Sequence, residues 1–219
     1  MASTGKTTGF IAIDIETTGK NFFTNVLFAI GIAWGDASGI QTCKIVVDLE
    51  KPPERSWEEH WQERQWEPRC WNEFWSKNVE ALDALQKNDR LIKIDELSRV
   101  FNAQLSAIEE LFDKTVLVFD AIAFDPVWTS TLLMRDGYNP LNYTRKGVHR
   151  WSYNVDSLTE GALCIDGNEE WARLVKERNE RIDVLLPELG VTQNDHDPAH
   201  DAEHILAQYL RARAFCRTK

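Results

Sequence analysis

Two acidic side chains interrupt an otherwise apolar stretch near the start of the chain, at residues 10–19. The apolar residues there and the closing Thr-Thr-Gly predict a buried β-strand. Because side chains alternate along a strand, Asp14 and Glu16 should point to the same face of the sheet. Two carboxylates this close repel each other unless a cation lies between them, and oxygen ligands favour Mg2+ or Mn2+ over zinc. The alternative is that one carboxylate faces solvent at the strand end, although acidic residues are poor strand formers.

A further carboxylate follows a short apolar run at residues 116–119, which predicts another buried strand. Asp125 stands directly before Pro126, a residue favoured in the first turn of a helix, and the predicted helix continues to Arg135. On this stretch alone, Asp125 is either a functional carboxylate or simply the N-cap of that helix.

Another candidate motif, at residues 194–204, contains three histidines spaced four apart. The apolar spacing predicts a helix with Pro198 near its start, so His196 lies just before the helix and Asp201 about one turn inside it. An alternative takes His196, His200 and His204 together as zinc ligands. Pro198 argues against one continuous helix through His196, so we favour the first interpretation. The residues that mark the helix are Ala202, Ile205, Leu206, Tyr209 and Leu210.

The remaining apolar pattern indicates the elements that would carry these residues. Runs at 25–33 and 40–49, separated by turn-forming residues, predict that the first strand opens a β-meander. An amphipathic helix at 94–112 and the short strand that follows it predict a crossover onto the same sheet. A short strand at 153–158 and a charged surface helix at 169–185 complete the prediction. We therefore expect a single α/β domain over the whole chain.

Residues 56–88 are unusually rich in tryptophan. The aromatic residues recur at helical spacing and predict two helices separated by Pro68. One interpretation makes them stacking platforms for unpaired bases. The other makes them a core stripe that covers the sheet, and we favour it because periodic aromatics usually face a core. The residues concerned are Trp57, Trp61, Trp66, Trp71, Phe74 and Trp75.

Composition limits the classes of protein to consider. The chain has 219 residues, 43% of them hydrophobic and 27% charged, which suits one globular domain. The formal net charge of −10 argues against a general polyanion-binding surface. The polar first residues and the lack of a long apolar run predict neither a secretory signal nor a membrane span. The 4 scattered cysteines predict free thiols in a reducing compartment, the cytoplasm or nucleus. A basic cluster at residues 143–151 is either a phosphate-binding surface or a solvated loop.

Together these motifs resemble the DEDDh family of 3′–5′ exonucleases, in the DnaQ-like superfamily of proofreading exonucleases. The resemblance rests on Ile-Asp-Ile-Glu-Thr-Thr-Gly in the first strand, Phe-Asp at Asp125, and a histidine five residues before Asp201. Their order covers about residues 9–212 and implies a ribonuclease H-like fold, with a mixed central sheet flanked by helices.

Two features depart from the usual family pattern. Where the family often has His-Asn-Ala before the Phe-Asp, this chain has Ala-Ile-Ala preceded by Asp120, which makes Asp120 the alternative to Asp125. We choose Asp125. Residues 50–90 look like a helical insertion without a counterpart in the minimal family domain, and its Trp-rich character is similar to exonucleases of large DNA viruses.

The resemblance implies a mechanism that the residue types also support. Four carboxylates would hold two divalent ions, Mg2+ or Mn2+, about 3.5–4 Å apart, one activating water and the other stabilising the leaving 3′ oxygen. His196 would accept the proton of the water as general base. The segment Thr17, Thr18 and Gly19 would lie near the terminal nucleotide, with Phe22 as an apolar wedge. The four carboxylates are Asp14, Glu16, Asp125 and Asp201.

The expected reaction is hydrolysis of phosphodiester bonds at 3′ ends of DNA or RNA, with release of nucleoside 5′-monophosphates. One alternative is a catalytically weak nucleic-acid-binding or protein-interaction module on the same fold, which would have no need to gather four carboxylates. Another is a metal-dependent transferase or endonuclease on the related ribonuclease H fold. The sequence alone does not choose between DNA and RNA, and it does not show whether a polymerase binds this chain.

Overall fold

The computed structural model describes residues 8–36, 39–120, 124–135, 137, 153–154 and 196–218. Three sequence predictions lie outside these residues: the helix at 169–185, the basic cluster at 143–151 and the strand residues beyond 154. Among the described residues, none of the helices is long and apolar enough to cross a membrane.

A five-stranded mixed sheet forms the centre of the molecule, with the strand order β3-β2-β1-β4-β5. The first three strands form the predicted antiparallel meander, whereas β4 and β5 run parallel to β1. This arrangement confirms the predicted mixed α/β fold. The strands are β1 (Thr8–Thr17), β2 (Leu27–Asp36), β3 (Gly39–Val46), β4 (Lys114–Phe119) and β5 (Tyr153–Asn154).

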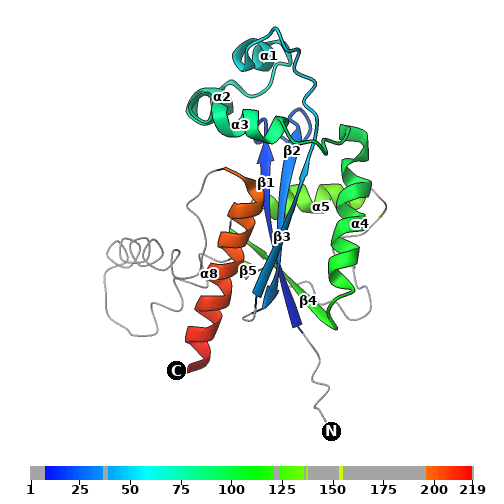
Figure 1. Ribbon diagram of the computed structural model, residues 1–219, viewed down its shortest axis with the longest axis vertical. Helices are drawn as coiled ribbons and strands as arrows, with labels where there is room; N and C mark the ends of the chain where they lie inside the picture. The colour runs from blue at the N-terminus through cyan, green and yellow to red at the C-terminus, as the bar shows by residue number, and fades with distance from the viewer. Residues whose placement is uncertain are drawn as a thin grey trace, which may run out of the picture.

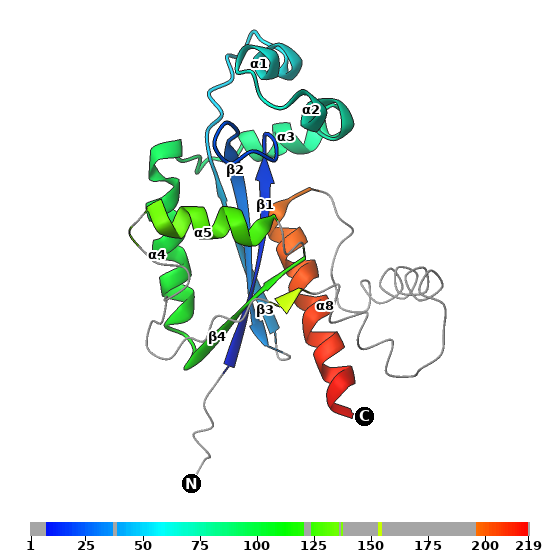
Figure 2. The ribbon, with the colours of Figure 1, turned by 180° about the vertical axis from the view of Figure 1, so that it is seen from behind.

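Helices cover both faces of this sheet. Figures 1 and 2 show α8 (Pro198–Thr218) on one face, and α4 (Leu97–Glu109) and α5 (Asp125–Arg135) on the other. A short 3-10 helix, η2 (Ile94–Glu96), precedes α4. The predicted amphipathic helix is present, and it buries an apolar stripe because its apolar residues recur at three- and four-residue spacing. That stripe comprises Leu97, Phe101, Leu105 and Ile108.

The two faces of β1 have different partners. Ile11, Ile13 and Ile15 belong to the large core shared with α4 and α5. Phe10 and Ala12 instead pack in a second cluster with side chains of α8. Because side chains alternate along a strand, the two acidic residues at the end of β1 continue the series that faces α8. The alternation predicted from the sequence thus directs both carboxylates toward the start of the last helix.

The Trp-rich insertion forms a small helical cap beyond the end of β1 (Figure 1). It comprises α1 (Trp57–Glu63), α2 (Pro68–Glu73), the 3-10 helix η1 (Trp75–Lys77) and α3 (Val79–Gln86). Its five tryptophans are all buried, and Trp61 is only 1% exposed. This burial confirms the core interpretation over stacking platforms. The five buried tryptophans are Trp57, Trp61, Trp66, Trp71 and Trp75.

The helical boundaries of the insertion differ from the prediction in one respect. Pro68 begins a helix as predicted, but the second predicted helix is broken at Phe74 and Asn78. Phe74 has a non-helical backbone, with φ −127° and ψ −72°. The Asn78 side chain donates to the Phe74 carbonyl oxygen at 3.0 Å, which closes this turn. Local periodicity does not reveal the break, because the apolar residues on both sides still face the same core.

Candidate metal centre and adjoining pocket

The first part of the site lies where β1 meets the start of α8. Asp14 pairs in register with Gly31 of β2. A methyl group at Gly31 would overlap the carbonyl oxygen of Pro198, the first residue of α8. Only a residue without a side chain therefore lets the N-terminus of α8 lie directly on the sheet beside Asp14.

The start of α8 is determined by the residues around Pro198. Asp197 accepts a hydrogen bond at 3.0 Å from the backbone N–H of Ala199, the geometry of an N-cap, and forms an ion pair with Lys44 of β3. Proline suits the first helical position because its missing N–H is not needed there. The helix therefore begins at Pro198, as predicted, leaving His196 outside it and Asp201 in its first turn.

These elements bring Glu16, His196 and Asp201 together. One potential ligand atom from each residue lies within 4.8 Å of the other two. Among the residues that the structure describes, neither His200 nor His204 belongs to this group. The geometry therefore favours the first interpretation of the motif over a zinc site made of three histidines.

Asp14 lies beside this group in a buried, electronegative environment. Its Oδ2 atom is buried and has no hydrogen-bond partner among the described residues. Burial raises the pKa of the Asp14 carboxyl well above its ordinary value, and the negative charges of Asp201, Asp125 and Asp120 raise it further. The carboxyl is thus destabilised in its ionised form by the protein alone.

Glu16 has the same electrostatic character. Burial raises the pKa of the Glu16 carboxyl well above its ordinary value, and the charge of Asp14 is the next largest cause. The charges of Asp201, Asp125 and Asp197 act in the same direction. A cluster of mutually repelling carboxyl groups fits a divalent cation, which would favour their ionised forms.

Asp120 directly follows β4, the strand next to β1, and Asp125 begins α5. The parallel pairing of β1 with β4 aligns Ala12 with Val118. Two residues beyond these positions are Asp14 and Asp120. Asp120 is exposed, whereas Asp125 is the first residue of α5 and only 5% exposed. The charge of Asp125 acts on both carboxyl groups of β1 and that of Asp120 acts on Asp14, and the choice of Asp125 as the functional residue stays a prediction.

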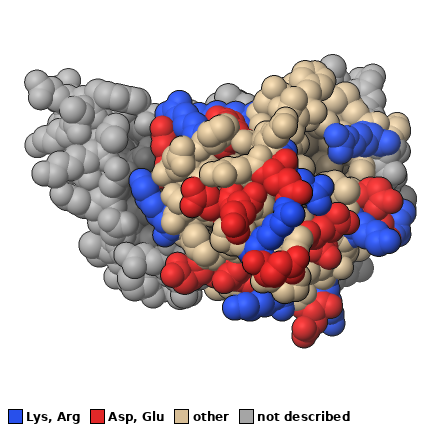
Figure 3. Space-filling model, turned by 90° about the horizontal axis from the view of Figure 1, so that it is seen from above, with Lys and Arg blue, Asp and Glu red and all other residues tan. Residues whose placement is uncertain are grey.

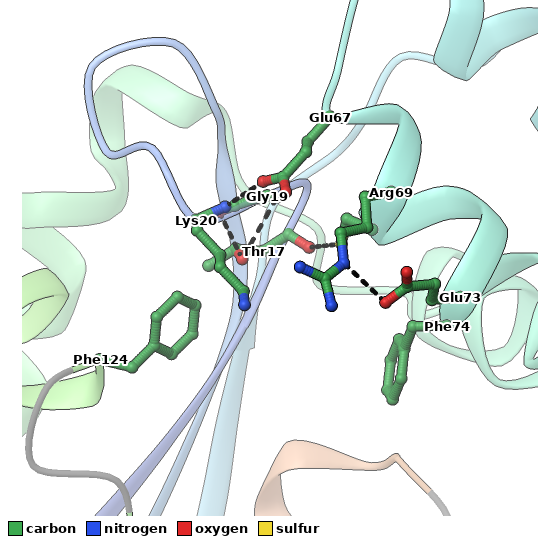
Figure 4. A pocket seen from close by; sticks show the side chains of 9 residues that line it. Thr17, Gly19, Lys20, Glu67, Arg69, Glu73, Phe74 and Phe124 are labelled. Carbon is green, nitrogen blue, oxygen red and sulfur yellow. Dashed lines mark hydrogen bonds and ion pairs between the residues drawn. The ribbon is translucent and has the colours of Figure 1, made fainter.

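A cavity of about 260 Å³ lies between the end of β1, the insertion and the start of α5, and its lining includes the chain neighbours of Glu16 and Asp125. Figure 4 shows Phe124 on one side of it and Phe74 on the other, with the Arg69 and Lys20 side chains also reaching into it. The cavity therefore combines aromatic and cationic groups near an acidic cluster. Its lining residues are Thr17, Gly19, Lys20, Glu67, Arg69, Cys70, Glu73, Phe74 and Phe124.

The four predicted substrate-binding residues have different positions. Thr17 and Gly19 line the cavity, and the Thr17 hydroxyl donates to the Gly19 carbonyl oxygen at 2.9 Å. The Thr18 side chain is fully buried and accepts from the N–H of Val26 at 2.8 Å, so it holds the turn toward β2. Phe22 is half-buried, with its ring 6.3 Å from that of Trp128. Substrate contact at all four remains a prediction.

Sequence reasoning missed the contribution of the insertion to this cavity. Arg69, Glu73 and Phe74 lie on a segment whose periodicity indicates only a core. No local pattern pairs that segment with Gly19 or Lys20, because the contact joins segments far apart in the sequence. The one sequence signal for this contribution was the high aromatic content of residues 56–88, which indicates an ordered, packed segment.

Surface charge around the cap is mixed. Figure 3, which looks onto this end of the molecule, shows acidic and basic side chains interspersed over the described residues. Arg69 pairs with Glu73 at 2.8 Å, and Arg55 forms an ion pair with Glu63. The described residues on this face thus carry charges of both signs.

The strand order, the helices on both faces and the acidic cluster at the end of β1 define a ribonuclease H-like exonuclease fold. No protein-family model and no curated protein matches the sequence.

Solved structures of exonuclease I resemble the chain. E. coli exonuclease I in complex with a dA16 oligonucleotide has a TM-score of 0.56 and 14% identity, over 96% of this chain and 43% of that one. The zinc-bound E. coli ExoI–ssDNA complex has a TM-score of 0.54 and 14% identity, over 96% of this chain and 40% of that one. Exonuclease I from Methylocaldum szegediense has a TM-score of 0.55 and 17% identity, over 94% of this chain and 41% of that one. The chain thus spans about two fifths of the length of these proteins. At identities this low, the structural likeness shows a shared fold alone.

Proposed function

We propose that this protein is a metal-dependent 3′–5′ exonuclease of the DEDDh type. It would hydrolyse phosphodiester bonds at the 3′ ends of single-stranded DNA or RNA and release nucleoside 5′-monophosphates. The observation that carries the proposal is the group of Glu16, His196 and Asp201, with ligand atoms within 4.8 Å of one another, on a fold shared with exonuclease I. Two of those neighbours are complexes with single-stranded DNA, which supports the choice of substrate class.

The carboxylates of the cluster would hold two divalent ions, Mg2+ or Mn2+. Support comes from the buried Asp14 Oδ2 without a hydrogen-bond partner among the described residues and from the raised pKa values of Asp14 and Glu16. When bound, such ions activate water and neutralise charge that develops on the phosphodiester. The proposed ligands are Asp14, Glu16, Asp125 and Asp201.

His196 would serve as the general base. Its imidazole lies beside Glu16 and Asp201, so it can accept a proton from water at the phosphodiester. Imidazole suits this role because its ordinary pKa of about 6.5 leaves most of it neutral at neutral pH. Its position before the helix, outside the regular backbone of α8, leaves the ring directed toward the carboxylates.

The adjoining cavity would receive the 3′-terminal nucleotide. Lys20 and Arg69 would contact phosphate oxygens, and the ring of Phe124 offers an apolar surface for a base. Thr17 and Gly19 would contribute the wall formed by the first motif. Thr17 follows Glu16 and Phe124 precedes Asp125 in the chain, so a terminal nucleotide here would put its phosphodiester near the acidic cluster.

The test is degradation of end-labelled DNA and RNA oligonucleotides, single- and double-stranded, with Mg2+ or Mn2+. We expect a ladder that shortens from the 3′ end, loss of cleavage in EDTA, and recovery when the metal is restored. Internal fragments would indicate an endonuclease. Binding without cleavage by the wild-type protein would indicate the binding-module alternative. Glu16→Gln is the control variant, because it keeps the side-chain volume and removes a proposed ligand.

A further inference from the structure

We infer that Phe74 of the Trp-rich insertion is a positioning residue for His196. The two rings lie 4.6 Å apart between centroids, with an interplanar angle of 75°. This edge-to-face contact joins the cap to the residue proposed to accept the proton. The inference rests on the proposed function, and it assigns the insertion a role in the reaction itself.

His196 is a residue whose orientation has to be determined by its neighbours. Its backbone φ is +58°, in the left-handed region that side-chain-bearing residues rarely adopt. It precedes Pro198, so the regular backbone of α8 does not hold it. A histidine ring has a broad, roughly two-fold preference for χ2, so packing against a second ring restricts which nitrogen faces the carboxylates.

Phe74 is itself packed against another aromatic residue of the cap. Its ring contacts Trp75 at 4.8 Å between centroids and 90° between planes. Trp75 packs in turn on Phe28 of β2 and donates its indole N–H to the carbonyl oxygen of Thr17 at 3.1 Å. The orientation of His196 is thereby connected through two aromatic rings to the end of β1.

The same cap also holds the loop that follows the first acidic motif. The Glu67 carboxylate accepts from the backbone N–H of Lys20 at 2.6 Å, and the Glu67 N–H donates to the carbonyl oxygen of Thr18 at 3.3 Å. The Cys70 thiol lies 3.6 Å from the Thr17 carbonyl oxygen, which accepts its hydrogen bond. One insertion therefore contacts both the first motif and the histidine of the last motif, and it sets their relative position.

Two other roles for Phe74 make different kinetic predictions. A base-stacking role would weaken substrate binding when the ring is lost, because Phe74 also lines the cavity. A purely structural role would reduce activity equally whether or not His196 is present. A positioning role acts through His196, so its effect should vanish once the imidazole has been removed.

The experiment is a double-mutant cycle with Phe74→Leu and His196→Ala, using single-stranded oligonucleotides and Mg2+. We expect Phe74→Leu to lower kcat by roughly tenfold, as a misplaced catalytic group does, with KM changed less than about twofold. In the His196→Ala background the same substitution should lower kcat no further. Phe74→Tyr should restore most of the rate. Phe112→Leu, a half-buried phenylalanine against Gly9, is the matched control and should leave kcat unchanged.

A spectroscopic measurement answers the same question without turnover. The imidazole resonances of His196, assigned by comparison with His196→Ala among the 5 histidines, should change in Phe74→Leu because the ring current of Phe74 is lost. Unchanged resonances would overturn the inference, as would equal rate losses in both backgrounds or an effect on KM alone. If the wild-type protein cleaves no substrate, the proposed function fails, and the resonances still test the contact.

Discussion

At the scale of single residues, the three histidines near the C-terminus illustrate how one proline separates similar side chains. His196 precedes Pro198 and joins Glu16 and Asp201, whereas His200 and His204 lie on α8. A spacing of four would align all three on one helix face, but the helix begins only at Pro198. Proximity to the carboxylates therefore distinguishes His196 from the other two.

We expect His196→Ala to lower kcat by about 10²–10⁴-fold, the usual effect of losing a general base. His200→Ala and His204→Ala should lower it far less, and all three variants should still bind a single-stranded oligonucleotide in Ca2+. Turnover is measured for all three under one metal condition. Equal inactivation of His200→Ala or His204→Ala in a folded protein would contradict the assignment, and so would near wild-type turnover of His196→Ala.

The raised pKa values of Asp14 and Glu16 predict how the free energy of unfolding depends on pH. Asp14 and Glu16 have pKa values raised above their ordinary values of 3.8 and 4.5, so the metal-free folded protein holds these protons to higher pH than the unfolded chain does. Their contribution to the free energy of unfolding is present below the ordinary pKa values and is lost as pH rises through the raised ones. Urea titrations in EDTA from pH 4 to 8 measure this loss.

The variant Asp14→Asn separates this effect from other titrating groups. It removes one negative charge from the cluster, so the metal-free melting temperature should stay the same or rise while nuclease activity is lost. Its stability should also depend less steeply on pH than that of the wild type. The exposed Asp89→Asn is the control and should change neither property. A large fall in melting temperature with activity retained would make Asp14 a structural residue.

At the scale of elements, the close contact between β2 and α8 sets the geometry of the site. Gly31 lies opposite Asp14, and the Pro198 carbonyl occupies the space where a side chain would be. The ion pair of Lys44 with Asp197 holds the start of α8 on β3 as well. The position of Asp201 relative to Glu16 thus depends on how closely a helix approaches the sheet.

We predict that Gly31→Ala displaces the start of α8 and strongly reduces activity. Overpacking at such a site typically costs about 1–3 kcal/mol of stability. Chemical denaturation measures that loss, and kcat of the folded fraction measures the displacement of the site. Gly39→Ala is the matched control, because a side chain there would meet nothing within 4 Å. Wild-type kcat in Gly31→Ala would show that the close approach is unnecessary for the reaction.

At the scale of the whole molecule, the net charge of −10 implies that nucleic acid, the proposed substrate, would be held locally. Among the described residues, Lys20 and Arg69 are the cations that line the cavity. Arg69 also pairs with Glu73, as Arg55 pairs with Glu63 and Arg64 with Glu50. Affinity should therefore depend on few phosphate contacts, together with bound metal ions and base stacking.

This view predicts a shallow salt dependence of binding. Two phosphate contacts to single-stranded nucleic acid correspond to a slope of about −1.4 in log K against log salt concentration. Fluorescence anisotropy of a labelled oligonucleotide in Ca2+ measures the slope, and Arg69→Ala should make it shallower by about 0.7. A slope of −3 or steeper would assign additional contacts, with residues 143–151 as the first region to test.

The sequence by itself determined the features that depend on local periodicity. A strand alternates, so Asp14 and Glu16 share one face, and proline suits only a first helical turn, so α8 begins at Pro198. The same local rules predicted the meander, the amphipathic helix at 94–112 and the core role of the tryptophans. These features follow from neighbours within a few residues along the chain.

Only the tertiary structure decided how these parts meet. The contact of Phe74 with His196 and the cavity between the cap and the first motif join segments separated by many residues. Apolar periodicity reports that a side chain is buried, but it carries no information about the partner that buries it.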